Sequence, residues 1–212
     1  TDMGVNMAGN CICDDEACRE ASKQEIIRRY FDALNALAKG STSEKEAQKI
    51  ELLMNMAGIT VTDRKVVIKA LERAKETDGP AAALELRDGR IITGKTTNLL
   101  GASAALLLNV LKVLAGIDHE THIISPESIE PIQKLKVDYL KSKNPRLHTD
   151  EVLIALSASA ATNPQARLAL SQLPELAGCQ AHTSVMLSDV DIKIFKKLEV
   201  QLTSEAVYEH AL

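Results

Sequence analysis

The hydrophobic periodicity of this chain changes near residue 79, and this change constrains the fold more than any other feature. Before that point, apolar residues recur at helical spacing in three runs, at 24–39, 44–57 and 63–76. After Pro80, short runs rich in β-branched residues alternate with longer helical runs. We therefore predict a helical subdomain at residues 1–79 and an α/β subdomain at residues 80–212.

The α/β part is expected to have the order β-β-α-β-α-α-α-β-α-β. The five strands are expected at 81–86, 90–95, 121–125, 181–187 and 200–203. The helices are expected at 101–115, 126–141, 150–161, from 164, and at 189–198, with Thr149 and Ser188 as caps. This order is typical of an α/β fold in which helices cover a mixed sheet.

Residues 89–96, Gly-Arg-Ile-Ile-Thr-Gly-Lys-Thr, match the phosphate-loop pattern G-x-x-x-x-G-K-[ST]. A phosphate loop curls its backbone N–H groups around an anion and continues directly into a helix. The preceding Asp88-Gly89 pair instead indicates a β-hairpin, because it lies between two runs that favour strands. We expect Asp88 and Gly89 to be the two central residues of a tight turn, with Gly89 at positive φ. An ATP-binding hydrolase is the alternative.

The composition argues against several classes of partner. A net charge of −4 gives no electrostatic attraction to nucleic acid. No apolar run approaches the roughly 20 residues that span a bilayer, so no membrane partner is expected. Four cysteines without a dense framework are typical of a reducing compartment. We therefore expect a cytoplasmic protein, and a homo-oligomer because self-association is common among such proteins.

Several strings in the chain resemble a bacterial family of unknown function, DUF1846 or UPF0371. They lie at 3–9, 21–30, 92–95, 129–132, 144–154 and 198–203, and the similarity covers essentially the whole chain. The resemblance implies the C-terminal portion of longer proteins, with an α/β subdomain of cytidine-deaminase-like topology beside a helical insert. Some relatives carry the label ATP-dependent peptidase. Glu199 departs from the family pattern, which has Gly at this position of Leu-Gly-x-x-Leu-Thr.

The start of the chain is unusual for a natural terminus, because position 1 is Thr rather than Met. Residues 1–13 are therefore expected to continue from an N-terminal domain that is missing here, as a fragment of a larger protein. That missing domain is the first partner that we expect.

Metal chemistry finds little support in the sequence. A zinc deaminase needs His/Cys-x-Glu at one helix start and Pro-Cys-x-x-Cys at the next. The helix after the hairpin begins Gly101-Ala-Ser-Ala-Ala105, with no ligand and no acid, and Cys179 has no second cysteine two or three residues away. Cys11, Cys13 and Cys18 are spaced like metal ligands but lack the nearby His that a four-ligand site needs. Reduced thiols are the favoured interpretation. No zinc is expected, and the cofactor, if any, is left unknown.

The best polar cluster is Asn144-Pro-Arg-Leu-His-Thr-Asp-Glu151 at a predicted helix start. Arg146 supplies a fixed cation, His148 titrates near neutrality, and Thr149 caps the helix. The loop after the second strand adds Lys95, Thr96 and Asn98, where ligands often bind in α/β folds. His182, on a strand, is a second candidate for acid–base chemistry.

These residues predict a site for a small anionic metabolite. Lys95 and Arg146 would neutralise its charge, and His148, with His182 as the second candidate, would transfer a proton. Ordinary helix capping explains every residue of the cluster except His148, so whether the protein is an enzyme is left open. A non-catalytic subdomain whose apolar faces serve assembly is the remaining alternative.

Overall fold

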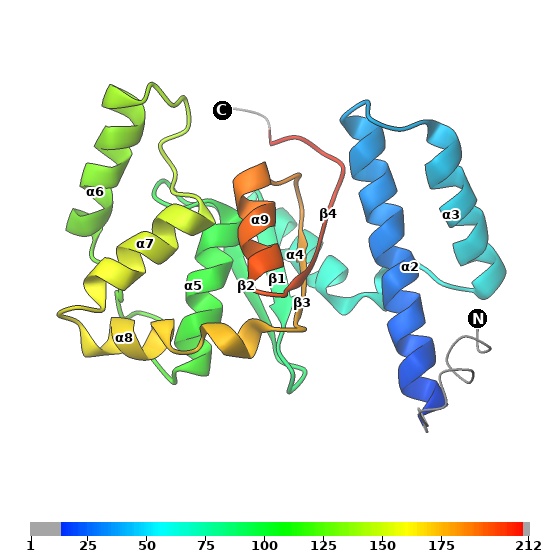
Figure 1. Ribbon diagram of the computed structural model, residues 1–212, viewed down its shortest axis with the longest axis horizontal. Helices are drawn as coiled ribbons and strands as arrows, with labels where there is room; N and C mark the ends of the chain where they lie inside the picture. Colours follow the sequence, from blue (N-terminus) through cyan, green and yellow to red (C-terminus); the bar gives the residue numbers. More distant parts are fainter. Residues whose placement is uncertain (1–13, 210–212) are drawn as a thin grey trace. The chain divides into compact units, whose positions relative to one another are not determined.

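The computed structural model describes residues 14–209, which form two compact units that divide between Arg64 and Lys65. The described part of the first unit contains helix α2 (Asp15–Ala38), helix α3 (Glu44–Ala57) and the short 3-10 helix η1 (Val61–Asp63) (Figure 1). Helix α2 begins earlier than expected, because the carboxylate of Asp14 accepts a hydrogen bond from the N–H of Ala17 at 2.9 Å. The predicted helical character of this region is confirmed.

The second unit begins with helix α4 (Lys65–Thr77), the third helix of the predicted helical subdomain. Val66 and Ala70 of α4 are fully buried against Ala83 of the first strand. This helix therefore belongs to the α/β unit, and the boundary predicted near residue 79 does not coincide with the division of the structure.

Four strands form one mixed sheet in the order β2-β1-β3-β4. They are β1 (Ala81–Glu85), β2 (Ile91–Lys95), β3 (Gln180–Thr183) and β4 (Gln201–Ser204). Strand β1 is antiparallel to β2 and β3, whereas β3 and β4 are parallel. The chain therefore has the predicted mixed α/β fold, while the cytidine-deaminase-like topology stays a prediction.

The strand expected at 121–125 does not form. Ile123 and Ile124 are both buried in the main hydrophobic cluster, as a run of two apolar residues predicts, but their backbone is irregular. The burial of this segment was therefore predicted correctly, but its pairing as a strand was not. A short apolar run alone does not distinguish a buried strand from a buried irregular segment.

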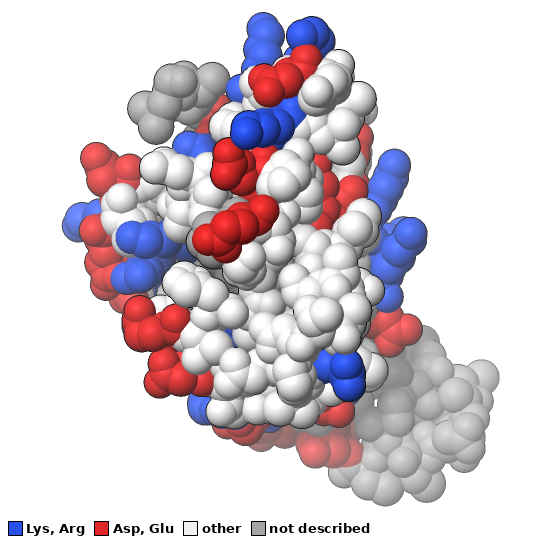
Figure 2. Space-filling view, turned by 90° about the vertical axis from the view of Figure 1, so that its left-hand side faces the viewer, with Lys and Arg blue, Asp and Glu red and all other residues white. Residues whose placement is uncertain are grey.

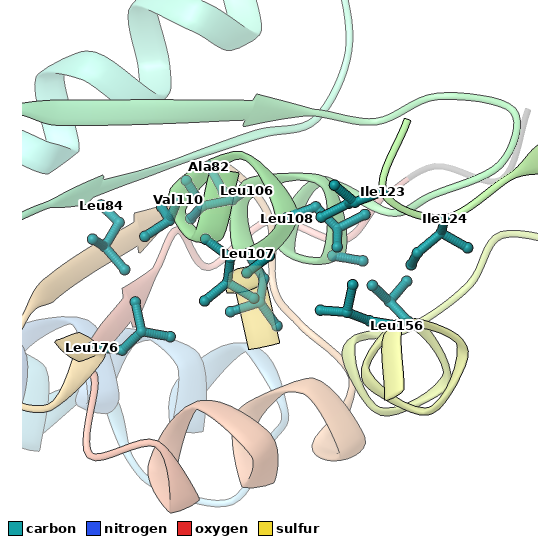
Figure 3. Close-up of a cluster of buried hydrophobic side chains, with 14 of the residues drawn as sticks. Ala82, Leu84, Leu106, Leu107, Leu108, Val110, Ile123, Ile124, Leu156 and Leu176 are labelled. Atoms are coloured by element: carbon teal, nitrogen blue, oxygen red, sulfur yellow. The ribbon is translucent and has the colours of Figure 1, made fainter. Parts of the chain in front are cut away.

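Both faces of the sheet are covered, which explains why β1 is buried along almost its whole length. Ala83 faces α4, whereas its neighbours Ala82 and Leu84 belong to the larger cluster around helix α5 (Ala102–Leu114). Figure 3 shows Leu106, Leu107 and Val110 of α5 within this cluster. Since successive side chains of a strand point to opposite faces, α4 and α5 lie on opposite sides of the sheet.

The remaining helices follow the predicted order. They are α6 (Pro126–Lys134), the π-helical turn η2 (Leu135–Tyr139), α7 (Thr149–Ser159), α8 (Pro164–Leu170), the 3-10 helix η3 (Leu173–Leu176) and α9 (Asp189–Lys197). The helix expected at 126–141 therefore continues past α6 as a π turn. Helix α7 starts at Thr149 with His148 in the capping position, one residue earlier than expected.

The hairpin between β1 and β2 has the predicted register, with Ala82 opposite Gly94. Its loop has three residues rather than two. The N–H of Leu86 donates to the carbonyl of Arg90 at 2.8 Å, and the N–H of Gly89 donates to the carbonyl of Leu86 at 2.9 Å. The central turn residues are thus Arg87 and Asp88, and Gly89 follows at φ 82°. The predicted positive φ is confirmed, whereas the predicted central position of Gly89 is wrong.

Gly94 sets the distance between the sheet and helix α5. A Cβ atom at this position would lie 2.2 Å from the backbone nitrogen of Leu106. Only glycine therefore lets α5 approach β2 this closely. This contact fixes the position of α5, whose N-terminus borders a cavity.

Candidate functional site

A cavity of about 200 Å³ lies in the second unit, beyond the ends of β2 and β3. The N-terminal ends of three helices border it: Ala102 and Ser103 of α5, His148 before α7, and Ser188 before α9. Its other polar side chains are Thr96, Asn144, Arg146, Asp191 and Glu209. The cavity thus collects polar groups from loops that are far apart in the sequence.

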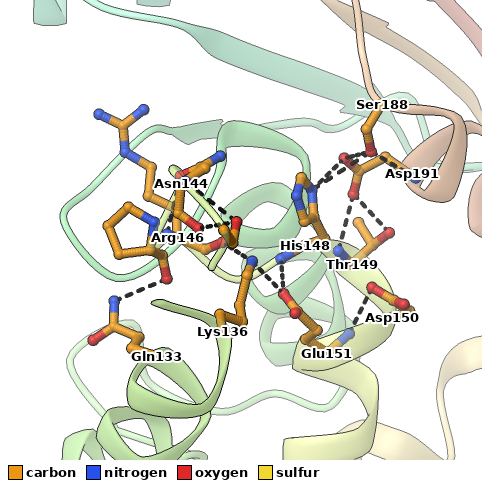
Figure 4. Close-up of polar contacts among 12 residues, drawn as sticks. Gln133, Lys136, Asn144, Arg146, His148, Thr149, Asp150, Glu151, Ser188 and Asp191 are labelled. Atoms are coloured by element: carbon orange, nitrogen blue, oxygen red, sulfur yellow. Dashed lines mark hydrogen bonds and ion pairs between the residues drawn. The ribbon is translucent and has the colours of Figure 1, made fainter. Parts of the chain in front are cut away.

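Asp191 lies at the centre of a hydrogen-bond network on one wall of the cavity (Figure 4). Its Oδ2 lies 3.0 Å from Nδ1 of His148 and accepts a hydrogen bond from Oγ of Ser188 at 2.7 Å. Its Oδ1 accepts bonds from the backbone N–H and the hydroxyl of Thr149, at 2.9 and 2.8 Å. Asp191 therefore joins the starts of α7 and α9 and holds the His148 ring.

The network lowers the pKa of Asp191 and raises the pKa of His148, and both shifts favour an ion pair between the two side chains. Burial alone would raise the pKa of Asp191, but hydrogen bonds from His148, Thr149 and Ser188 outweigh it and lower this pKa to about 2. The hydrogen bond to Asp191 raises the pKa of His148 above its usual value, although burial opposes this shift. The His148 ring therefore carries a proton more readily than a free imidazole does.

The geometry of Ser188 does not match that of a serine nucleophile. In a catalytic triad the serine contacts the imidazole nitrogen that the carboxylate leaves open. Here the hydroxyl of Ser188 lies 3.5 Å from Nδ1 of His148, the same nitrogen that faces Asp191. The arrangement can therefore support proton transfer through Nε2 of His148, but it does not activate Ser188.

A buried ion pair supports the loop that carries Arg146 and His148. The ammonium of Lys136, only 6% exposed, donates to Oε2 of Glu151 at 2.8 Å and to the carbonyl of Arg146 at 2.6 Å. The same Glu151 oxygen accepts the N–H of His148 at 2.8 Å. Asn144 also accepts the N–H of Arg146. The backbone of this loop is therefore fixed on both sides.

Arg146 brings a permanent positive charge to the cavity, where it pairs with the carboxylate of Glu209. The paired carboxylate is on an exposed residue near the end of the described chain. An anionic ligand would compete with Glu209 for the guanidinium of Arg146.

Helix α5 presents an unused N-terminus to the cavity. Its N-cap residue is Gly101, which has no side chain to accept a hydrogen bond. Ser103, in the first turn, lines the cavity and is 3% exposed. Within residues 14–209 its hydroxyl has no hydrogen-bond partner. This end of the cavity therefore offers donors that the described protein leaves unsatisfied.

The structure brings together some of the residues that the sequence singled out. Thr96, Arg146 and His148 line the cavity, and Thr149 lies directly behind it, bonded to Asp191. Lys95 is exposed at the end of β2 and Asn98 is exposed in the following loop, and neither lines this cavity. The predicted contribution of Lys95 and Asn98 therefore does not apply to this cavity.

His182 lies outside the cavity and is completely buried in β3. Its Nδ1 lies 2.8 Å from the hydroxyl of Thr203 on β4, and its Nε2 lies 3.3 Å from a carboxylate oxygen of Glu205. These contacts connect two neighbouring strands. His182 is therefore not at the cavity, where it was predicted as the second candidate for proton transfer.

The phosphate-loop match does not form a phosphate loop. Residues Ile91 to Lys95 of this string are strand β2, and the next helix begins only at Ala102. The string therefore lacks the direct passage into a helix that phosphate binding requires. Thr96, its last residue, nevertheless reaches the cavity.

No group of three or more His, Cys, Asp or Glu residues within 14–209 is placed to hold a metal ion. Cys18 lies on α2, whereas Cys11 and Cys13 lie outside the described residues. The metal hypothesis for these cysteines is therefore not tested. Among the described helices, none has the length and apolar character that crossing a membrane requires.

Sequence reasoning missed Ser103, Ser188 and Asp191 as site residues. The start of α9 was interpreted only as a helix cap, and Ser188 does accept the N–H of Asp191 at 3.2 Å. The missing information was the contact with His148, because 43 residues separate His148 from Asp191 in the sequence. The sequence did contain one local signal, because Ser188 and Asp191 are polar residues at the start of a predicted helix that directly follows a loop.

The fold and the cavity define a mixed α/β protein with a small polar site at the end of its sheet. The profile of the C-terminal domain of unknown function DUF1846 matches residues 62–212, and that of the N-terminal DUF1846 domain matches residues 1–58. The chain belongs to this family, also called UPF0371. The two matches meet close to the division at Arg64. The expected membership of this family is therefore confirmed, and residues 1–58 match the model of its N-terminal domain in addition to the C-terminal match.

Relatives from two bacterial genera are similar over almost the whole chain. A UPF0371 protein of Corynebacterium aurimucosum is 60% identical over 98% of this chain. UPF0371 proteins of Corynebacterium urealyticum and Streptococcus thermophilus are 57% and 50% identical over 98% and 99% of it. The chain spans 42% of the length of each of these relatives. Their names assign no activity.

Proposed function

We propose that the cavity beyond β2 and β3 binds a small anionic molecule and that His148 exchanges a proton with it. The observation that carries the proposal is the presence of Arg146 and the open N-terminus of α5 at one cavity. A guanidinium and unpaired N–H groups at a helix start both favour negative charge. The acidic groups at the cavity are both paired, Glu209 with the guanidinium of Arg146 and Asp191 with the imidazole of His148, whose pKa is raised.

The size of the cavity limits the ligand. Sites for drug-sized molecules usually measure about 300–1,000 Å³, whereas this cavity measures about 200 Å³. A ligand of a few carbon atoms fits this volume better than a nucleotide does. Thr96 and Asn144 are available for its polar groups.

His148 is the candidate for proton transfer because Asp191 occupies its Nδ1. A carboxylate at one ring nitrogen fixes the tautomer and orients the other nitrogen toward its task. The side chain of His148 is 32% exposed, so it is accessible to a ligand in the cavity.

Thermal unfolding in the presence of a panel of small carboxylates and phosphates tests the proposal. We expect at least one anion to raise the melting temperature of the wild type and to have a much smaller effect on Arg146→Gln. Arg90→Gln is the matched control, because Arg90 forms an exposed ion pair with Asp88 in the hairpin. Equal stabilisation of the wild type and of both variants would contradict the proposal.

A second candidate function is assembly, which the surface of α7 and α8 favours. Between Val152 and Pro174 the sequence contains a single charged residue, Arg167. Ile154 is 67% exposed and Leu168 is 47% exposed. Figure 2, which faces this side of the second unit, shows a broad uncharged area bordered by charged residues.

An exposed apolar area of this kind supports self-association into a homo-oligomer. Light scattering after size-exclusion chromatography tests it. We expect the wild type to have the mass of an oligomer and Ile154→Lys to have a lower mass. A monomeric wild type would contradict this second candidate.

A further inference from the structure

We propose that the start of helix α5 is a subsite for the phosphate group of a small phosphate ester. This inference rests on the proposed function and names the class of ligand. Its key residue is Ser103, which borders the cavity and is 3% exposed. In residues 14–209 nothing accepts or donates a hydrogen bond at its hydroxyl. Because Ser103 lines the cavity, an oxygen of a bound ligand is the natural partner of its hydroxyl.

The three helix starts at the cavity differ in whether their N–H groups are already used. At α7, the N–H of Thr149 donates to Asp191 and that of His148 donates to Glu151. At α9, the N–H of Asp191 donates to Ser188. At α5, Gly101 provides no side-chain acceptor, so the described part of the chain leaves the N–H groups of the first turn available.

These donors suit a tetrahedral oxyanion better than a carboxylate. The hydroxyl of Ser103 and the first N–H groups come from the start of α5, and the guanidinium of Arg146 comes from the loop before α7. A phosphate monoester has three terminal oxygens and can accept from all of them, whereas a carboxylate has two. Hydrogen bonds from backbone N–H groups at a helix start to phosphate are common in proteins.

The rest of the ligand must fit beside His148. With the phosphate at α5, the remaining space of this cavity of about 200 Å³ is bordered by Asn144, His148 and Ser188. A short ester with hydroxyl groups can bond to these side chains and exchange a proton with the imidazole. The inferred ligand is therefore a small phosphorylated polyol or acid.

Isothermal titration calorimetry with three probes tests this inference: inorganic phosphate, glycerol 3-phosphate and malonate. We expect both phosphates to bind the wild type more tightly than malonate does. We expect Ser103→Ala to weaken the binding of both phosphates about tenfold, because a hydrogen bond to a charged group is lost. Ser159→Ala is the control, since the hydroxyl of Ser159 bonds within α7 to the carbonyl of Ala155.

The outcomes separate this inference from the proposed function. Phosphate binding that is unchanged in Ser103→Ala but lost in Arg146→Gln would overturn the α5 subsite and leave the proposed function supported. Binding of malonate without binding of either phosphate would overturn the class of ligand alone. No binding of any probe would contradict both. Circular dichroism melting of Ser103→Ala shows that the variant is folded.

Discussion

The carboxylate of Asp191 lies 3.0 Å from Nδ1 of His148, although 43 residues separate the two in the sequence. Asp191 is 3% exposed and accepts four hydrogen bonds, so it is fixed more firmly than a surface acid. This relationship connects the starts of α7 and α9 and gives His148 its raised pKa.

Replacing Asp191 with Asn should lower the pKa of His148. The amide removes the negative charge that favours the protonated ring of His148. Burial of His148 and the charge of Lys136 continue to lower its pKa, whereas the charge of Glu151 continues to raise it. NMR titration of the His148 ring measures the shift. Asp189→Asn is the control, because Asp189 is an exposed acid in the same helical turn. An unchanged His148 pKa in Asp191→Asn would show that the contact does not govern ionisation.

The same pair predicts how stability depends on pH. Because the folded-state pKa of Asp191, about 2, is below its usual 3.8, its contribution is present above about pH 4 and is lost as the pH falls toward 2. This contribution amounts to about 2 kcal/mol. The contribution of His148, whose pKa is raised, is present below pH 6.5 and is lost as the pH rises through the folded-state pKa.

Urea unfolding of the wild type and of Asp191→Asn at several pH values measures this dependence. The difference in the free energy of unfolding should narrow by about 2 kcal/mol between pH 5 and pH 2. A difference that stays constant over this range would contradict the assignment of a lowered pKa to Asp191.

Gly94→Ala should strongly destabilise the second unit. The new Cβ would lie 2.2 Å from the nitrogen and 2.5 Å from the Cα of Leu106, and these backbone atoms cannot rotate away. We expect the free energy of unfolding to fall by about 3 kcal/mol, the upper range for overpacked sites.

Gly79→Ala is the control for this substitution. A Cβ at Gly79 would lie 3.8 Å from the carbonyl oxygen of Thr77, an ordinary contact. We expect its cost to stay below about 1 kcal/mol. Equal costs in the two variants, measured by urea unfolding, would mean that α5 can move away from β2.

Glu199→Gly should stabilise the protein. Glu199 has a φ of 57°, in the left-handed region that costs a residue with a side chain about 1–2 kcal/mol. Since glycine loses more backbone entropy on folding, we expect a net gain of up to about 1 kcal/mol in the free energy of unfolding. Glu199→Ala keeps a Cβ and should give no gain. A gain in both variants would assign the effect to the carboxylate instead.

The fold could be predicted from the sequence where local patterns decide it. Asp88-Gly89 and the β-branched residues after it predicted the register of the hairpin, and only the loop length differed. The helix start at Ser188 was predicted from its capping side chain. The irregular segment at Ile123 was not, because apolar runs indicate burial but not the partner that a strand needs.

The site was less accessible to sequence reasoning. Arg146 and His148 stood out as members of one polar cluster before a predicted helix, and both line the cavity. Asp191 and Ser103 could not be assigned to the site because their roles depend on contacts across the fold. Lys95 was expected at the site because it lies at the exit of a predicted strand, where ligands often bind in α/β folds, but at the end of β2 it is exposed and does not line the cavity.

The most direct test of the central claim is an NMR titration of the ¹⁵N-labelled protein with inorganic phosphate, glycerol 3-phosphate and malonate. We expect at least one of these anions to cause saturable shifts of the backbone amides of Thr96, Ser103 and Arg146 and of the His148 ring. Shifts spread over exposed lysines without saturation, or no shifts at these four residues with any probe, would contradict the claim that this cavity binds a small anionic molecule.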